Sequence, residues 1–178
     1  MQVRMMQGKM STKPSMSKAI ILMGVSGSGK TTIGHALSST LGWPFIDGDD
    51  FHSPENVNKM SQGIPLSDED RLRWLETLSH LLSENYNRVE NLVLACSALK
   101  RNYRDQLRSN HADITFIYLE GGIEMIRQRM QVREKHYMKP GMLESQFQIL
   151  EPPQNALQIN IERPINEIVQ EIIDVLGN

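Results

Sequence analysis

Cysteine is the rarest residue type in this sequence: only one of its 178 residues, Cys96, is a cysteine. One cysteine excludes an intrachain disulfide and a zinc site built on cysteine ligands. Such scarcity is typical of a reducing compartment, so we expect a cytoplasmic protein. No apolar run is long enough to span a bilayer, and we therefore expect no membrane association.

A large excess of charge of either sign is also absent. The net charge is −2 and the isoelectric point is near 6.2. Because nucleic-acid-binding proteins usually present a strongly basic surface, we expect no nucleic-acid partner. The length and the hydrophobic fraction of 39% predict one soluble globular domain.

Acidic residues are missing from the beginning of the chain. Residues 1–18 contain four basic residues and none that is acidic. They also lack the apolar segment of a secretory signal. We interpret residues 1–17 as a disordered leader and residues 18–178 as the folded domain, with an organelle-targeting peptide as the alternative for the leader.

Glycine is concentrated in one motif, residues 24–31, which matches G-x-x-x-x-G-K-[ST]. Residues 19–23 are continuously apolar and predict a buried strand before it. After it, Ile33, Ala36, Leu37 and Leu41 have the spacing of an amphipathic helix. A strand, a glycine-rich turn and a helix in this order predict a phosphate-binding loop (P-loop).

The chemistry of this loop follows from its residue types. Backbone N–H groups and the helix N-terminus favour a polyphosphate, Lys30 is expected to reach the β- and γ-phosphates, and the Thr31 hydroxyl is expected to bind Mg²⁺. The predicted nucleotide-binding residues of the loop are Gly24, Val25, Ser26, Gly27, Ser28, Gly29, Lys30, Thr31 and Thr32.

Other candidate residues follow the next predicted strands. Asp47, Asp49 and Asp50 come after the second strand, where carboxylates can hold Mg²⁺ or accept a proton from an attacking hydroxyl; an acidic turn with a helix cap is the alternative. His52 can bind a substrate or simply stabilise the turn.

Two cations extend this set. Arg71 lies near the start of a long predicted helix, where it is either a solvated residue or a clamp for an anion. Lys100 follows the third strand, at the same edge of the sheet.

Arginines surround a predicted lid. Arg127, Arg129 and Arg133 lie along one predicted helix, and the polar residues 134–141 interrupt the pattern; the lid is expected to extend over about 134–147. Arginines beside such a segment can close over the triphosphate, although surface ion pairs are expected for one or two of these three. Arg163 lies in a loop expected to border the adenine.

Five predicted strands alternate with helices, at residues 19–23, 43–46, 91–96, 114–119 and 156–160. This alternation predicts an α/β fold with a doubly wound, mostly parallel five-stranded sheet. A P-loop alone permits a kinase, an ATPase or a GTPase, but the chain lacks the Asn-Lys-x-Asp motif that reads guanine. The compact chain, the acidic turn and the basic lid favour a small-molecule kinase, with a non-catalytic nucleotide-binding regulatory protein as the alternative.

The chain resembles the gluconokinase family, of the thermoresistant type, from about Lys18 to its end. The residues that carry the resemblance are Gly24-Val25-Ser26-Gly27-Ser28-Gly29-Lys30-Thr31, Asp47-Gly48-Asp49-Asp50-Phe51-His52, Asn58-Lys59-Met60, Gly63-Ile64-Pro65-Leu66, residues 68–71, Trp74-Leu75, Cys96-Ser97-Ala98-Leu99-Lys100, Tyr103-Arg104-Asp105 and Ser145-Gln146-Phe147. The resemblance implies a nucleoside-monophosphate-kinase-like fold with a lid, phosphorylation of the 6-hydroxyl of D-gluconate by ATP, a role in the pentose phosphate route, and a homodimer.

The resemblance also implies roles for single residues. Asp47 is expected to bind Mg²⁺ and Asp49 to contact the substrate hydroxyl, and Arg129 and Arg133 match lid arginines of the family. Residues expected to hold gluconate are Arg71, Lys100 and His52. A shikimate kinase or another polyol-acid kinase is the rival within this superfamily, but Cys96-Ser97-Ala98 stands where shikimate kinases have a glycine-rich turn.

Overall fold

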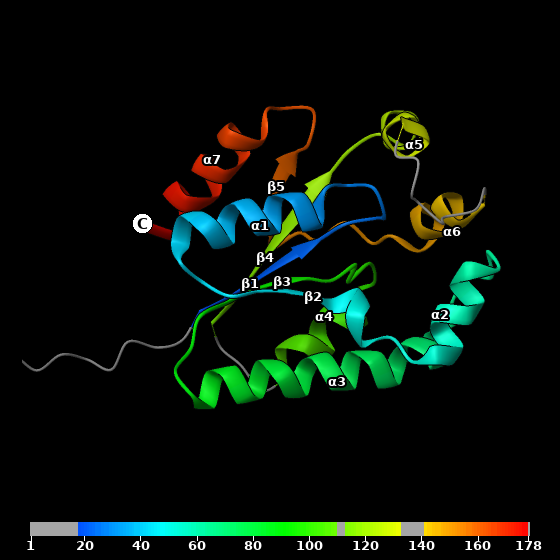
Figure 1. Ribbon diagram of the computed structural model, residues 1–178, viewed down its shortest axis with the longest axis horizontal. Helices are drawn as coiled ribbons and strands as arrows, with labels where there is room; N and C mark the ends of the chain where they lie inside the picture. Colours follow the sequence, from blue (N-terminus) through cyan, green and yellow to red (C-terminus); the bar gives the residue numbers. More distant parts are fainter. Residues whose placement is uncertain (1–17, 110–112, 133–140, 178) are drawn as a thin grey trace, which may run out of the picture.

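The computed structural model describes residues 18–109, 113–132 and 141–177. The predicted leader, residues 1–17, lies outside these ranges, as do Arg133 and residues 134–140 of the predicted lid. The described residues form one parallel sheet covered by helices on both faces (Figure 1).

The sheet has five strands in the order β2-β3-β1-β4-β5, and every pairing between neighbouring strands is parallel. This confirms the predicted doubly wound α/β fold. The strands are β1 (Ala19–Met23), β2 (Phe45–Asp47), β3 (Leu92–Ala95), β4 (Ile114–Glu120) and β5 (Leu157–Asn160).

Strand β1 lies at the centre of the sheet and is buried on both faces. Ile20 and Leu22 belong to one hydrophobic core, and Ile21 and Met23 belong to the other. A strand covered on both sides is apolar at every position rather than at alternate positions, which explains its unbroken apolar sequence.

The helices divide between the two faces of the sheet. Helices α1 and α7 lie on one face, and α3 and α4 lie on the other, whereas α2, α5 and α6 lie beyond the carboxyl ends of the strands (Figure 1). Their bounds are α1 (Lys30–Leu41), α2 (Pro54–Ser61), α3 (Asp68–Asn87), α4 (Arg101–Arg108), α5 (Ile123–Val132), α6 (Met142–Ile149) and α7 (Ile165–Gly177). In the described ranges, no helix combines the length and the apolar character needed to cross a membrane.

The region after the second strand differs from its prediction. Strand β2 begins at Phe45 rather than at residue 43, and the acidic cluster forms a 3₁₀ helix, η1 (Gly48–Phe51). The Asp47 side chain caps this helix by accepting a hydrogen bond from the Asp49 N–H. The indole N–H of Trp74 donates to the Gly48 carbonyl at 2.6 Å, so a residue of α3 holds η1 in place.

Candidate active site

The glycine-rich segment leaves β1 in a backbone conformation that side chains disfavour. Gly24 has a φ of 145°, and a Cβ atom there would lie 2.9 Å from the Leu119 carbonyl oxygen. Gly29, with a φ of 95°, is the N-cap of α1. Glycine at these positions lets the loop fold closely over the end of the sheet.

The N-terminus of α1 is open, in contrast to those of α2 and α3. Side chains of Ser53 and Ser67 cap those two helices, but no side chain caps α1. The first N–H groups of α1 are therefore available to an anion, which the helix dipole also favours. The Ser28 hydroxyl beside them is buried and has no hydrogen-bond partner among the described residues, so the loop fits a phosphate group that supplies acceptors.

Lys30 is folded back along the loop. Its ammonium group donates hydrogen bonds of 3.0 Å to the carbonyls of Gly24 and Val25. Burial lowers the pKa of Lys30, whereas the nearby charges of Asp49 and Asp47 raise it. A bound polyphosphate would add negative charge beside this buried ammonium and stabilise its protonated form.

Thr31 and Asp47 come together as the predicted Mg²⁺ pair. The Thr31 hydroxyl donates to Asp47 Oδ2 at 2.9 Å, and two oxygen ligands side by side fit the preference of Mg²⁺. The described ranges contain no group of three or more His, Cys, Asp or Glu side chains able to hold a metal ion. The remaining ligands would therefore come from phosphates and water, as is usual for Mg²⁺ in kinases.

Two cavities of about 500 Å³ each flank the P-loop. We name the first the Lys30 cavity, because the Lys30 side chain lines it. Ser26 lines it, together with four other predicted site residues. These four come from the P-loop, from η1 and its C-cap, and from the start of α3. They are Lys30, Asp49, His52 and Arg71.

His52 is held by an aromatic partner within the Lys30 cavity. Its ring stacks on Trp74 with 4.3 Å between centroids, and its Nε2 atom lies 3.8 Å from Asp49 Oδ1. Burial lowers the pKa of His52, Asp49 opposes this effect, and Arg71 adds to it. The imidazole is therefore neutral at neutral pH. Its Nδ1 atom is buried and has no partner among the described residues.

Arg71 and Lys100 differ in their positions. The Arg71 guanidinium donates to the Leu66 carbonyl and lines the Lys30 cavity, with no carboxylate partner in the described part of the chain. Lys100 does not line this cavity; its ammonium donates to Asp68 at 2.7 Å. Asp68 also accepts a hydrogen bond from the Tyr103 hydroxyl, and both bonds lower the pKa of Asp68.

The second cavity lies on the other side of the P-loop, and we name it the Arg129 cavity. The predicted nucleotide-binding residues that line it are Gly27, Ser28, Gly29, Thr32, Arg129 and Arg163. Arg129 donates to the Ile161 carbonyl at 2.7 Å. The apolar side chains of Met125, Val132 and Ile165 also line the cavity, which suits a flat aromatic base.

Ion pairs hold two arginines near this region. Arg127 binds Glu144 at 2.6 Å and also Glu124, so it is one of the surface ion pairs expected for this helix. Arg163 pairs with Glu171 and lies 3.6 Å from Glu167 of α7. Arg163 therefore lines the Arg129 cavity while its charge is largely balanced.

Gln146 was not predicted as a site residue. From α6, its Oε1 atom accepts a hydrogen bond of 2.7 Å from the Ser26 N–H, and its Nε2 atom lies 3.2 Å from Ser26 Oγ. It also lines the Lys30 cavity. Its signals in the sequence were its place near the end of the predicted lid and the Ser145-Gln146-Phe147 motif of the family resemblance, and neither indicates its partner. Ser97 and Trp74 line the same cavity and were likewise not predicted as site residues.

Comparison with known proteins identifies the family of the chain. A model of the shikimate kinase family matches residues 26–176. The chain is 46% identical to the thermosensitive gluconokinase of Escherichia coli, covering 88% of this chain and 84% of that protein. It is 41% identical to a gluconokinase of Arabidopsis thaliana, covering 90% and 93%.

A solved structure agrees as well. The crystal structure of a gluconokinase from Sinorhizobium meliloti superposes with a TM-score of 0.82 at 40% identity, and covers 91% of this chain and 93% of that one. Sequence and structure therefore give the same result. The chain belongs to the gluconokinase family, within the P-loop kinases related to shikimate kinase.

Proposed function

We propose that this enzyme transfers the γ-phosphoryl group of ATP to the 6-hydroxyl of D-gluconate and produces 6-phospho-D-gluconate. Family membership supports the reaction, since several relatives carry the name gluconokinase. The observation that carries the proposal is the pair of cavities on the two sides of the P-loop. A kinase must bind a phosphoryl donor and an acceptor next to each other, and the two cavities can hold one each.

The nucleotide is assigned to the Arg129 cavity. In this proposal the backbone N–H groups of the P-loop and the Lys30 ammonium hold the phosphates, while Arg163 borders the base. Arg129 stabilises the charge that develops on the transferring group. Arg133, which lies outside the described residues, is assigned the same role by family resemblance.

The acceptor is assigned to the Lys30 cavity. The 6-hydroxyl oxygen forms a bond to the γ-phosphorus as the bond from that phosphorus to the β,γ-bridging oxygen breaks, and Asp49 accepts the hydroxyl proton. Thr31 and Asp47 would hold Mg²⁺, which neutralises phosphate charge when bound.

Two cations and a neutral imidazole are proposed to recognise the sugar acid. Arg71 is suited to the carboxylate of gluconate, because a guanidinium binds a carboxylate through two parallel hydrogen bonds. His52, neutral and buried, can exchange hydrogen bonds with a hydroxyl. Lys100 is proposed as a further contact, which requires that its ammonium turn from Asp68 toward the acceptor.

An assay of ADP release tests the proposal. With Mg²⁺ and ATP, we expect release that depends on gluconate and not on shikimate or neutral sugars. Release with shikimate instead would indicate the rival kinase, and no acceptor-dependent release would indicate a nucleotide-binding regulatory protein.

A lysine variant tests the assigned site. Lys30→Ala should lower kcat by at least about a hundredfold, because it removes a cation that contacts the transferring charge. The matched control is Lys18→Ala, whose exposed side chain precedes β1 at the end opposite the P-loop, lines neither cavity and should leave kcat unchanged. Near-normal turnover by the Lys30 variant with an intact fold would refute the assigned site.

We further infer a homodimer that works in the cytoplasm and feeds the pentose phosphate route. Family resemblance supports the dimer, and the single cysteine supports the reducing compartment. Light scattering on the purified full chain should give twice the mass of 20.3 kDa. A monomeric mass would contradict the dimer and leave the proposed reaction intact.

A further inference from the structure

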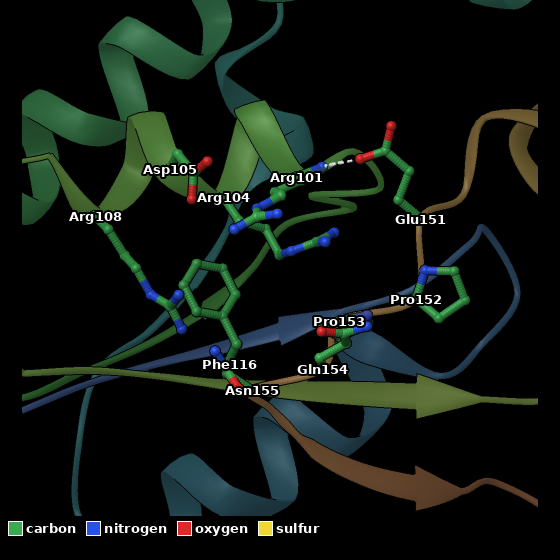
Figure 2. Close-up of a pocket in the computed structure, with 10 residues that line it drawn as sticks. All are labelled: Arg101, Arg104, Asp105, Arg108, Phe116, Glu151, Pro152, Pro153, Gln154 and Asn155. Atoms are coloured by element: carbon green, nitrogen blue, oxygen red, sulfur yellow. Dashed lines mark hydrogen bonds between the residues drawn. The ribbon is translucent and has the colours of Figure 1, made fainter.

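A cluster of positive charge lies outside both cavities, on helix α4. Arg101, Arg104 and Arg108 are spaced so that they share one face of this helix. They line a cavity of about 220 Å³, and Figure 2 shows them beside Phe116 of β4 and the segment of residues 151–155. We name this space the α4 cavity.

Arg104 is the most buried of the three arginines, with 6% of its surface exposed. Its Nη1 atom donates hydrogen bonds of 3.0 Å to the carbonyls of Ala98 and Leu99. Among the described residues, no carboxylate forms an ion pair with it. Burial lowers the pKa of Arg104, and the charges of Glu151 and Asp105 oppose this only in part. An anion in direct contact with the guanidinium would add to their effect.

The other two guanidinium groups are also without an ion pair in the described part of the chain. The Arg108 guanidinium lies 4.7 Å from the centre of the Phe116 ring, which fixes its position. The Glu151 carboxylate accepts a hydrogen bond of 2.6 Å from the backbone N–H of Arg101 rather than from a guanidinium group (Figure 2). Asp105 also lines the cavity, which therefore combines three guanidinium groups with two carboxylates and keeps one excess positive charge.

We propose that the α4 cavity binds a small phosphate-bearing anion, either free phosphate or a phosphate monoester. Guanidinium groups present paired N–H donors that match phosphate oxygens, and the lining keeps a net positive charge. The cavity is less than half the size of the Lys30 cavity, which favours a compact ligand.

The α4 cavity is connected to the catalytic centre through the loop after β3. Arg104 holds the carbonyls of Ala98 and Leu99, and Ala98 has the unusual φ of 42°. The preceding residue, Ser97, lines the Lys30 cavity, and its carbonyl accepts a hydrogen bond of 3.3 Å from the Gly24 N–H. An anion that binds Arg104 competes with the carbonyls of Ala98 and Leu99 for its N–H donors. The position of the loop after β3 therefore changes, and the KM for the acceptor changes with it.

Calorimetric titration tests the site on the full chain saturated with Mg²⁺ and a non-hydrolysable ATP analogue, so that the P-loop is filled. The probes are inorganic phosphate and 3-phosphoglycerate, which separate free phosphate from a monoester. We expect one saturable equivalent of at least one probe. The double variant Arg101→Gln/Arg108→Gln should bind it at least tenfold more weakly, and both side chains are exposed, so the fold should survive.

Arg73→Gln/Arg88→Gln is the matched control, since it removes the same two charges from exposed positions in α3 and at its end. It should bind the probe like the wild type. The absence of a saturable equivalent for both probes, or equal binding by the Arg101→Gln/Arg108→Gln variant, would overturn the site. At saturating probe, the KM for the acceptor should change in the wild type and not in that variant; an unchanged wild-type KM would overturn the connection through Arg104.

Discussion

Gln146 joins two parts of the chain that lie 120 residues apart. Its carboxamide contacts both the N–H and the hydroxyl of Ser26, so α6, which overlaps the end of the predicted lid, is attached directly to the P-loop. A side chain in this position can align the Lys30 cavity with the P-loop, because it contacts both.

Gln146→Ala should therefore lower kcat/KM. Two hydrogen bonds worth about 1–2 kcal/mol together correspond to a loss of roughly five- to thirtyfold. Steady-state kinetics with ATP and gluconate measure the effect, and Gln148→Ala, an exposed glutamine on the same helix, should behave like the wild type. Wild-type kinetics in the Gln146 variant would show that the contact is dispensable.

Cys96 lies directly after β3, beside the reacting groups, but it is chemically protected. The thiol is fully buried, and this burial raises its pKa to about 12. At pH 8 the thiolate fraction is then roughly one in 10⁴. Iodoacetamide should leave the native protein unmodified and label one thiol per chain in urea, as mass spectrometry can show. Rapid labelling of the folded protein would mean that the loop after β3 opens readily.

At the scale of elements, helices α2 and α3 are clamped to each other beside the Lys30 cavity. Asp70 accepts a hydrogen bond of 2.6 Å from Lys59 and one from the Ser67 N–H, which completes the cap of α3. The Asn56 side chain adds a bond of 2.8 Å to the Asp70 carbonyl. These contacts fix the wall that carries Arg71.

This clamp predicts a dependence of stability on pH. The bond from Lys59, followed by that from Ser67, lowers the pKa of Asp70 from 3.8 to about 2 in the folded protein. The carboxylate therefore stabilises the fold fully above the unfolded value of 3.8, and this contribution is lost as the pH falls toward about 2. Urea unfolding should show a stability difference between the wild type and Asp70→Asn that narrows over this range.

Glu69→Gln is the control for the Asp70 variant, because Glu69 is exposed in the same turn of α3. Its substitution should change stability less at neutral pH. A difference between wild type and Asp70→Asn that stays constant down to pH 2 would contradict the proposed role of the clamp.

The elements could be predicted from the sequence because their signals are local. The apolar periodicity of residues 30–41 and the unbroken apolar run of β1 depend only on near neighbours. Helix η1 was not predicted, since it depends on a bond from Trp74, 26 residues away. For the same reason the sequence could indicate Lys100 as a candidate but not its pairing with Asp68. Distant side-chain partners arise only from the assembled fold.

For the whole molecule, the sheet separates two hydrophobic cores. Ile21 packs in the core under α3 and α4, whereas Ile172 packs in the core under α1 and α7. Residues without shared neighbours contribute independently to stability. The changes in the free energy of unfolding caused by substitutions on opposite faces of the sheet should therefore add.

Ile21→Val and Ile172→Val should each lower the free energy of unfolding by about 0.5–1.5 kcal/mol, and the double variant by their sum to within about 0.5 kcal/mol. Chemical denaturation of the three variants measures this. Ile20→Val combined with Ile172→Val is the matched comparison, because these two residues share a core. A larger coupling across the sheet than within one core would contradict the separation.

The two cavities beside the P-loop share only α1 among their helices: α2, α3 and α6 line one of them, α5 and α7 line the other, and α1 contributes Lys30 to the first and Thr32 to the second. In the proposed assignment, the side chains that recognise the acceptor are therefore largely separate from those that bind ATP. Substitutions in α2, α3 and α6 can therefore change which sugar acid is accepted, in evolution or by design, while the site for ATP is retained.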